Sequence, residues 1–139
     1  MGLDTSHDCW HGSYSAFSRW RQELADAAGY MSAKVIYDNG EQSIGKTIFV
    51  DWGHLQDSMF GDWKETPKDP LLVLIAHSDC EGKIKNAQCG PLAGRLKQLL
   101  PKLPKEDDCG HIGNWREKTQ KFIDGLIKAA KAGEDVIFH

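Results

Sequence analysis

The chain has 139 residues, of which 40% are hydrophobic and 27% are charged, so it has the size and composition of one globular domain spanning 1–139. Its formal net charge of −3 offers no basic surface for nucleic acid, and no apolar stretch approaches the roughly 20 residues that span a bilayer. We therefore expect neither nucleic acid nor membrane as a partner. The N-terminus turns polar after three residues, unlike a secretory signal, so a cytoplasmic location with reduced thiols is expected.

The first predicted helix covers 14–28. Ser13 is a good N-cap and Gly29 suits the position just beyond the last turn. Arg21 falls in the apolar row of this helix, whereas Arg19 lies off it. A charged group on the inner face needs a partner. The apolar row consists of Tyr14, Phe17, Leu24 and Ala28.

A variable insertion is expected at 30–70, made of a hairpin over 33–52 and an irregular surface segment over 53–70. β-branched and aromatic residues flank the Asp-Asn-Gly turn of this hairpin. The most apolar run of the chain, 71–76, is short and follows a proline, which predicts a central buried strand.

Two further helices and a final strand are predicted in the last third. The first covers about 91–100, with Pro91 in its opening turn. The second begins after Asn114 and stops at Gly133, and we expect an inner face that includes Phe122, Ile123 and Leu126. The segment 136–138 then reads as a strand. The fold class is therefore α+β: a small mixed β-sheet packed with about three helices in one compact domain.

Two short runs concentrate the reactive side chains, HDCWH at 7–11 and HSDCEG at 77–82. Each places an imidazole, a carboxylate and a thiol within a few residues, and these groups bind metals, move protons or hold polar ligands. Ligand sites favour the carboxyl ends of strands, where the second run is expected. We therefore predict that both runs line one cavity. The expected ligand-binding residues are His7, Asp8, Trp10, His11, Arg19, Arg21, His77, Ser78 and Asp79.

Trp10 could stack on a ligand, and an arginine could clamp a phosphate or carboxylate. Arg19 and Arg21 point about 200° apart, because each helical residue turns by about 100°. Only one of them can easily face a site beside the helix, and the inward Arg21 is the better candidate. Its partner would be Asp8, Asp79 or an anionic ligand.

A metal site is the main alternative. A zinc ion accepts His, Cys and carboxylate ligands, but no CxxC spacing supports a structural site. The second run also resembles a calcium loop, although Gln88 replaces the bidentate glutamate and a plain turn is the favoured interpretation. A cysteine nucleophile at position 9 or 80 is a further option. The candidate zinc ligands are His7, Cys9, His11, His77 and Cys80.

The segments MGLDTSHDCWHGSYSAFSRWR, IAHSDCEG, LAGRLKQLLP and TQKFIDGLIKAAKAGEDVIFH resemble a family of small proteins of bacteria and their phages. The resemblance covers both ends and the centre of the chain, and 30–70 is the divergent part. No assigned activity comes with this family, so the resemblance implies no catalytic residue. It implies a cytoplasmic protein that a phage could encode.

The favoured hypothesis is a non-enzymatic protein that binds a small polar or nucleotide-like ligand without a cofactor. In a phage, such a protein would be a sponge that sequesters a nucleotide-derived immune signal. The alternatives are a zinc-dependent hydrolase built from the two runs and an inhibitor that binds a host protein. Enzymatic activity and homo-oligomerisation both stay open at this stage.

Overall fold

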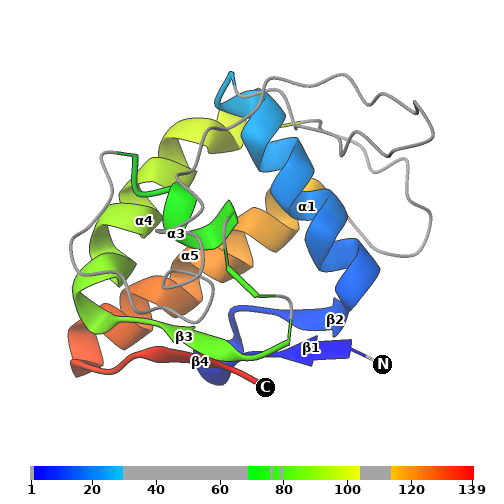
Figure 1. Cartoon of the computed structure of the whole chain (residues 1–139). Helices are drawn as coiled ribbons and strands as arrows, with labels where there is room; N and C mark the ends of the chain where they lie inside the picture. Colours follow the sequence, from blue (N-terminus) through cyan, green and yellow to red (C-terminus); the bar gives the residue numbers. More distant parts are fainter. Residues whose placement is uncertain (1, 30–68, 76, 79, 104–113) are drawn as a thin grey trace, which may run out of the picture.

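The computed structural model describes residues 2–29, 69–75, 77–78, 80–103 and 114–139 (Figure 1). Its long helices are α1 (Tyr14–Ala27), α4 (Asn86–Leu99) and α5 (Trp115–Ala132). Its strands are β1 (Gly2–Asp4), β2 (His11–Ser13), β3 (Gly82–Ile84) and β4 (Val136–Phe138). Short helical turns are η1 (Ser6–Asp8), α3 (Leu72–Ile75) and η2 (Leu100–Lys102). The α+β class with about three main helices is confirmed.

The β-structure joins the two ends of the chain. β1 pairs with β2, and β3 pairs with β4, each pair antiparallel. A bridge between Thr5 and Phe138, and mutual backbone hydrogen bonds between Asp4 and His139, connect the two pairs. The strands therefore follow one another in the order β2, β1, β4, β3 along the lower edge of Figure 1, with both termini at that edge.

Alternation along these strands separates an inner from an outer face, because successive side chains point to opposite sides. Leu3, Thr5 and Phe138 are buried on the inner face. Ile137 is 43% exposed on the outer face. The register pairs His11 with Asp4, so these two side chains share the outer face.

Helix α1 begins as the sequence predicts. The Ser13 hydroxyl accepts a hydrogen bond from the Ala16 N–H at 3.1 Å, which satisfies one of the free donors of the first turn. Gly29 ends the helix with a φ of 86°, a conformation that glycine adopts without a steric penalty. The helix turns Phe17 and Trp20 into the core.

Packed aromatic rings form the centre of the core. Trp10 stacks on Trp20 with ring centroids 5.0 Å apart, and Phe17 meets the Trp10 ring edge-on. Phe122 of α5 covers the other side of Trp20 at 4.9 Å. The Trp20 indole N–H donates to Thr119 Oγ1 at 2.8 Å, so this buried donor is satisfied. Burial of each such ring contributes about 1.5–3 kcal/mol to stability.

Helix α5 is capped at both ends by the predicted residues. The Asn114 side chain accepts from the Arg116 N–H at 2.8 Å, and Gly133 adopts a left-handed φ of 69°. Phe122, Ile123 and Leu126 are fully buried, as the sequence predicts.

The prediction of a central strand at 71–76 is wrong, because Leu72–Ile75 forms the helical turn α3. Asp69 initiates the turn: its carboxylate accepts from the Leu71 N–H at 3.0 Å, and its carbonyl accepts from the Leu72 N–H. A short apolar run has no periodicity that distinguishes a buried strand from a buried helix. Burial itself is as expected for Leu71, Val73 and Leu74.

Helix α4 starts five residues before the predicted position, so Pro91 lies inside the helix. The early start depends on contacts distant in sequence. Asp135 Oδ1 accepts from the Asn86 N–H at 2.7 Å, and the Asn86 side chain donates to the carbonyls of Ala129 and Glu134. Asn86 thus caps the C-terminal end of α5 while it begins α4.

The predicted hairpin at 33–52 and almost all of the segment 53–70 lie outside the described residues. None of the helices in the described ranges is long and apolar enough to cross a membrane.

Candidate functional site

The first run forms a closed, strained loop between β1 and β2. The Thr5 N–H donates to the Trp10 carbonyl at 3.1 Å, and the Trp10 N–H donates to Thr5 Oγ1 at 2.9 Å. Inside this loop His7 and Asp8 have φ values of 61° and 55°. Left-handed backbone is unfavourable for side chains other than glycine, and such strain is concentrated at functional sites.

The loop is pressed onto helix α5 at Gly125. A Cβ atom at this position would lie 2.4 Å from Cys9 Sγ and 2.8 Å from the His7 carbonyl oxygen. Only glycine permits so close an approach, so α5 packs against the loop and holds its unusual backbone in place.

His7 links the loop to the end of α5. Its Nε2 lies 3.1 Å from Glu134 Oε1, and its Nδ1 lies 2.9 Å from Ser6 Oγ. A neutral imidazole that donates from Nε2 to the carboxylate has an unprotonated Nδ1, so the Ser6 hydroxyl donates to it. Ser6 Oγ in turn accepts from the Ile137 N–H at 2.8 Å. A series of hydrogen bonds through Ile137, Ser6, His7 and Glu134 therefore connects both ends of the chain.

A second imidazole and carboxylate pair lies on the outer face of the β1–β2 pair. His11 Nδ1 is hydrogen-bonded to Asp4 Oδ1 across the β1–β2 pair. The hydrogen bond from His11 lowers the pKa of Asp4, and the nearby His139 lowers it further. We call the group formed by the two pairs and their neighbours the terminal-strand site. Its members are Asp4, Ser6, His7, His11, Glu134 and His139.

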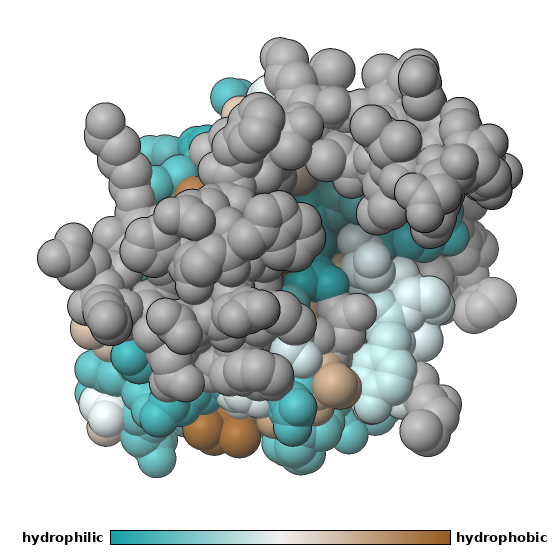
Figure 2. Space-filling model, viewed as in Figure 1, coloured by the Kyte–Doolittle hydropathy of each residue, from teal (hydrophilic) through white to brown (hydrophobic). Residues whose placement is uncertain are grey.

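Most residues around the terminal-strand site are polar, with one hydrophobic patch among them. Lys83 and Asp135 form an ion pair of 3.7 Å at the adjoining strands β3 and β4. Figure 2 shows hydrophilic residues over most of the described lower edge, with a hydrophobic patch among them. The exposed Ile137 belongs to this outer face. Asp8, from the first run, is exposed next to the site.

The first two residues of the second run, His77 and Ser78, are buried. His77 is 2% exposed, and its ring lies 4.0 Å from the ring of Phe138. His77 Nδ1 lies 2.9 Å from the Ser78 carbonyl oxygen, and Nε2 lies 2.9 Å from the Lys83 carbonyl oxygen. A carbonyl oxygen only accepts, so both hydrogen bonds form when the ring carries two protons. Ser78 is buried and accepts from the Cys80 N–H.

Arg21 holds the second run in place. Its Nη1 donates to the carbonyls of Ile75 and His77, and its guanidinium lies over the Phe17 ring at 4.7 Å. The inward orientation expected from the sequence is present, and Nη1 donates to main-chain carbonyls. Arg19 is exposed on α1.

The two runs meet through β4. The ring of Phe138 contacts the ring of His77 on the inner face, whereas His7 and His11 belong to the terminal-strand site. His77 and Ser78 of the second run are therefore buried, whereas His7 and His11 of the first run lie in the terminal-strand site. Asp79 lies outside the described residues.

Two of the three thiols in the described ranges, those of Cys9 and Cys89, are buried. Burial raises the pKa of Cys9 to about 12 and that of Cys89 to about 11, so both stay protonated at neutral pH. Cys80 is exposed. No group of three or more His, Cys, Asp or Glu in the described ranges is placed to hold a metal ion. The zinc ligands suggested by the sequence are therefore not brought together there.

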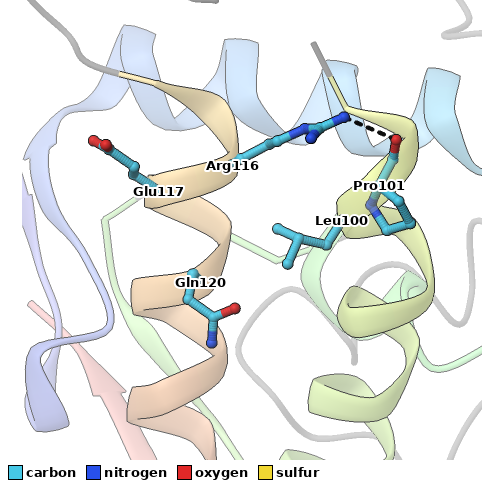
Figure 3. Close-up of a pocket in the computed structure, with 5 residues that line it drawn as sticks. All are labelled: Leu100, Pro101, Arg116, Glu117 and Gln120. Carbon is cyan, nitrogen blue, oxygen red and sulfur yellow. Dashed lines mark hydrogen bonds between the residues drawn. The ribbon is translucent and has the colours of Figure 1, made fainter. Parts of the chain in front are cut away.

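A shallow cavity of about 380 Å³ lies elsewhere, between the end of α4 and the start of α5 (Figure 3). Its wall includes Arg116, whose guanidinium already donates to the carbonyls of Leu103 and Pro101. None of the residues expected to bind ligand lines it. Its lining residues are Leu100, Pro101, Arg116, Glu117 and Gln120.

Comparison with known proteins supplies no relative: no family model matches the chain, no curated protein matches its sequence, and no solved structure matches its fold.

Four members of the terminal-strand site were not among the ligand-binding residues expected from the sequence: Asp4, Ser6, Glu134 and His139. A weak signal was present in the alternation of Asp4 with Ser6 and of Ile137 with His139, which places each pair on one side of an extended segment. Nothing in the sequence indicated that these two segments are neighbours, because they are separated by about 130 positions.

Proposed function

We propose that this protein binds a small polar ligand at the terminal-strand site and holds it without converting it. The observation that carries the proposal is the pairing of His7 with Glu134 and of His11 with Asp4 beside a loop with two left-handed residues. Strained backbone persists only where the surrounding structure enforces it, and it is concentrated at sites that bind ligands.

The chemistry of the site favours a ligand with hydroxyl or amine groups. Each imidazole is already bonded to a carboxylate, so the two pairs offer carboxylate oxygens as hydrogen-bond acceptors. The exposed Ile137 adds an apolar surface on which the carbon skeleton of such a ligand can rest. Small-molecule sites commonly combine an apolar surface with a few fixed polar groups.

A nucleotide-derived signal falls within this proposal through its sugar hydroxyls. In a phage-encoded protein, tight binding without turnover would remove such a signal from the host and so block a defence response. The cytoplasmic location that the sequence suggests belongs to the same proposal.

Native mass spectrometry of the protein purified from cells tests the proposal, because it reports bound mass and subunit number together. We expect a bound species in the wild-type protein that is recovered unchanged after denaturation. Glu134→Gln and His11→Ala should lose it, whereas the control Lys97→Ala, an exposed change on α4, should retain it. A ligand released in a chemically altered form would exclude simple binding.

A second function is favoured by one specific observation, the line Ser6–His7–Glu134. A serine hydroxyl that donates to an imidazole held by a carboxylate is an arrangement that can activate a nucleophile. We rank it second because Ser6 Oγ also accepts the Ile137 N–H, which gives this hydroxyl a structural role. Covalent labelling of Ser6 by a fluorophosphonate, lost in Ser6→Ala, would favour hydrolysis over binding.

A further inference from the structure

One buried donor in the core has no partner among the described residues, the indole N–H of Trp10. Trp10 is 2% exposed, and its neighbour Trp20 shows how such a donor is normally satisfied, by the hydroxyl of Thr119. A buried donor without an acceptor destabilises the fold, and a water molecule or a bound ion is one of the explanations for such a donor in native proteins.

A cation lies beside this donor. The Lys118 ammonium is 5.0 Å from the centre of the Trp10 ring. Within the described part of the chain, no carboxylate comes within 4 Å of Lys118 Nζ. Burial lowers the pKa of Lys118, and the charge of Lys121 one turn further along α5 lowers it further. Positive charge therefore gathers here without a described counter-charge.

Gly12 of β2 lies next to the indole nitrogen. A Cβ at that position would stand 3.4 Å from Trp10 Nε1 and 3.7 Å from Cε2. A larger residue would place its side chain against the nitrogen, whereas glycine adds no side-chain atom of its own there.

We propose that Trp10 Nε1, Lys118 and the position left free of a side chain at Gly12 form a binding site for a small oxyanion, a carboxylate or a phosphate group. One oxygen accepts from the indole N–H and another accepts from the ammonium, with Lys121 adding attraction from a distance. Hydrogen bonds between an ammonium and an oxyanion are among the stronger ones in proteins. This proposal is independent of the proposed function, because no member of the terminal-strand site contributes to it.

The test follows the Trp10 indole resonance in ¹H–¹⁵N spectra of the full chain, titrated with inorganic phosphate and, separately, with acetate. Sodium chloride at the same ionic strength is the reference. We expect a saturable shift of the Trp10 signal with one or both anions and none with chloride. Saturation by phosphate alone identifies a phosphate site, and saturation by acetate alone identifies a carboxylate site.

Variants separate binding from packing. Lys118→Met keeps an unbranched chain over the Trp10 ring and removes the charge, and it should weaken binding about tenfold or more. Gly12→Ala should weaken it as well by placing a methyl group at the Nε1 edge. Lys131→Met, in the last turn of α5, is the matched control and should bind like the wild type. The proposal is overturned if the Trp10 signal shifts with neither anion, or if Lys118→Met binds the anion with the same affinity as the wild type.

Discussion

Both runs contain histidine, aspartate and cysteine, but the structure places their histidines in different environments. In the first run, His7 and His11 face carboxylates at the terminal-strand site, and the backbone carries the strain. In the second, His77 is enclosed, and the partners of its ring nitrogens are main-chain carbonyls. An imidazole in a polar sequence context can therefore be a surface group or a structural cross-link. The neighbouring strand decides which for His77, because Phe138 of β4 packs against its ring.

The largest expected effect tests whether His77 is structural. His77→Ala removes the contact with Phe138 and the hydrogen bonding of the ring to the carbonyls of Ser78 and Lys83. We expect a loss of about 3 kcal/mol in the free energy of unfolding, since each buried acceptor without a partner costs about 1–3 kcal/mol. Urea denaturation followed by circular dichroism measures it. A change below about 0.5 kcal/mol, the size of an ordinary surface effect, would show that His77 is not a cross-link.

The next effect tests how the first run is supported. Gly125→Ala places a methyl group within 3 Å of Cys9 Sγ and the His7 carbonyl, and neither the loop nor α5 can move freely. Overpacking of this kind costs about 1–3 kcal/mol, and the same change should weaken ligand binding at the terminal-strand site by displacing His7.

Gly94→Ala is the control for Gly125→Ala, because nothing lies within 4 Å of a Cβ at this helical position. There the substitution should stabilise the protein by about 1 kcal/mol through helix propensity. Equal effects of the two substitutions would show that the loop is not seated on α5.

The cysteines of the two runs show the opposite pattern: Cys9 of the first run is buried, and Cys80 of the second run is exposed. At pH 8, 5,5′-dithiobis(2-nitrobenzoic acid) should modify Cys80 at least tenfold faster than Cys9, because the reactive thiolate is scarce when the pKa is about 12. Mass spectrometry of peptides locates the label. Similar rates at the two positions would contradict the burial of Cys9.

The raised thiol pKa values also predict how stability depends on pH. A thiol that is more protonated in the folded chain than in the unfolded chain stabilises the fold fully below the unfolded value of 9.0. This contribution is lost progressively as pH rises toward about 11 for Cys89 and about 12 for Cys9. The urea midpoint should therefore fall between pH 8 and pH 10.5, and Cys9→Ala should reduce that fall. A urea midpoint that does not change with pH over this range would contradict the expected effect of the raised thiol pKa values.

The smallest effect concerns the exposed pair. His11→Ala should leave the urea midpoint unchanged within error, because solvent-exposed ion pairs contribute little. The Asp4 pKa should rise toward its ordinary value of 3.8, since the hydrogen bond from His11 is the main cause of its lowering. An NMR titration of the Asp4 carboxyl measures this.

In the wild type, a carboxyl with a lowered pKa stabilises the fold above its unfolded value and loses this contribution as pH falls below 3.8. His11→Ala should remove that part of the acid sensitivity. An unchanged Asp4 pKa in the variant would show that His11 does not set it.

The sequence by itself determined the elements whose signals are local. Ser13, Asn114, Gly29 and Gly133 mark helix ends because a cap or a left-handed residue is a property of a few adjacent positions. The buried face of α5 followed from helical periodicity in the same way. The α+β class followed from the sum of these elements.

Only the tertiary structure decided the rest. The run 71–76 became a helical turn because Asp69 starts it, and α4 begins early because Asp135 and Asn86 meet across about 50 positions. The terminal-strand site depends on the pairing of Asp4 with His139, and no local pattern specifies which distant strands pair. Whether a histidine is buried or exposed depends on what packs over it. That is a property of the assembled fold, since the same imidazole is stable in water or, fully hydrogen-bonded, in the core.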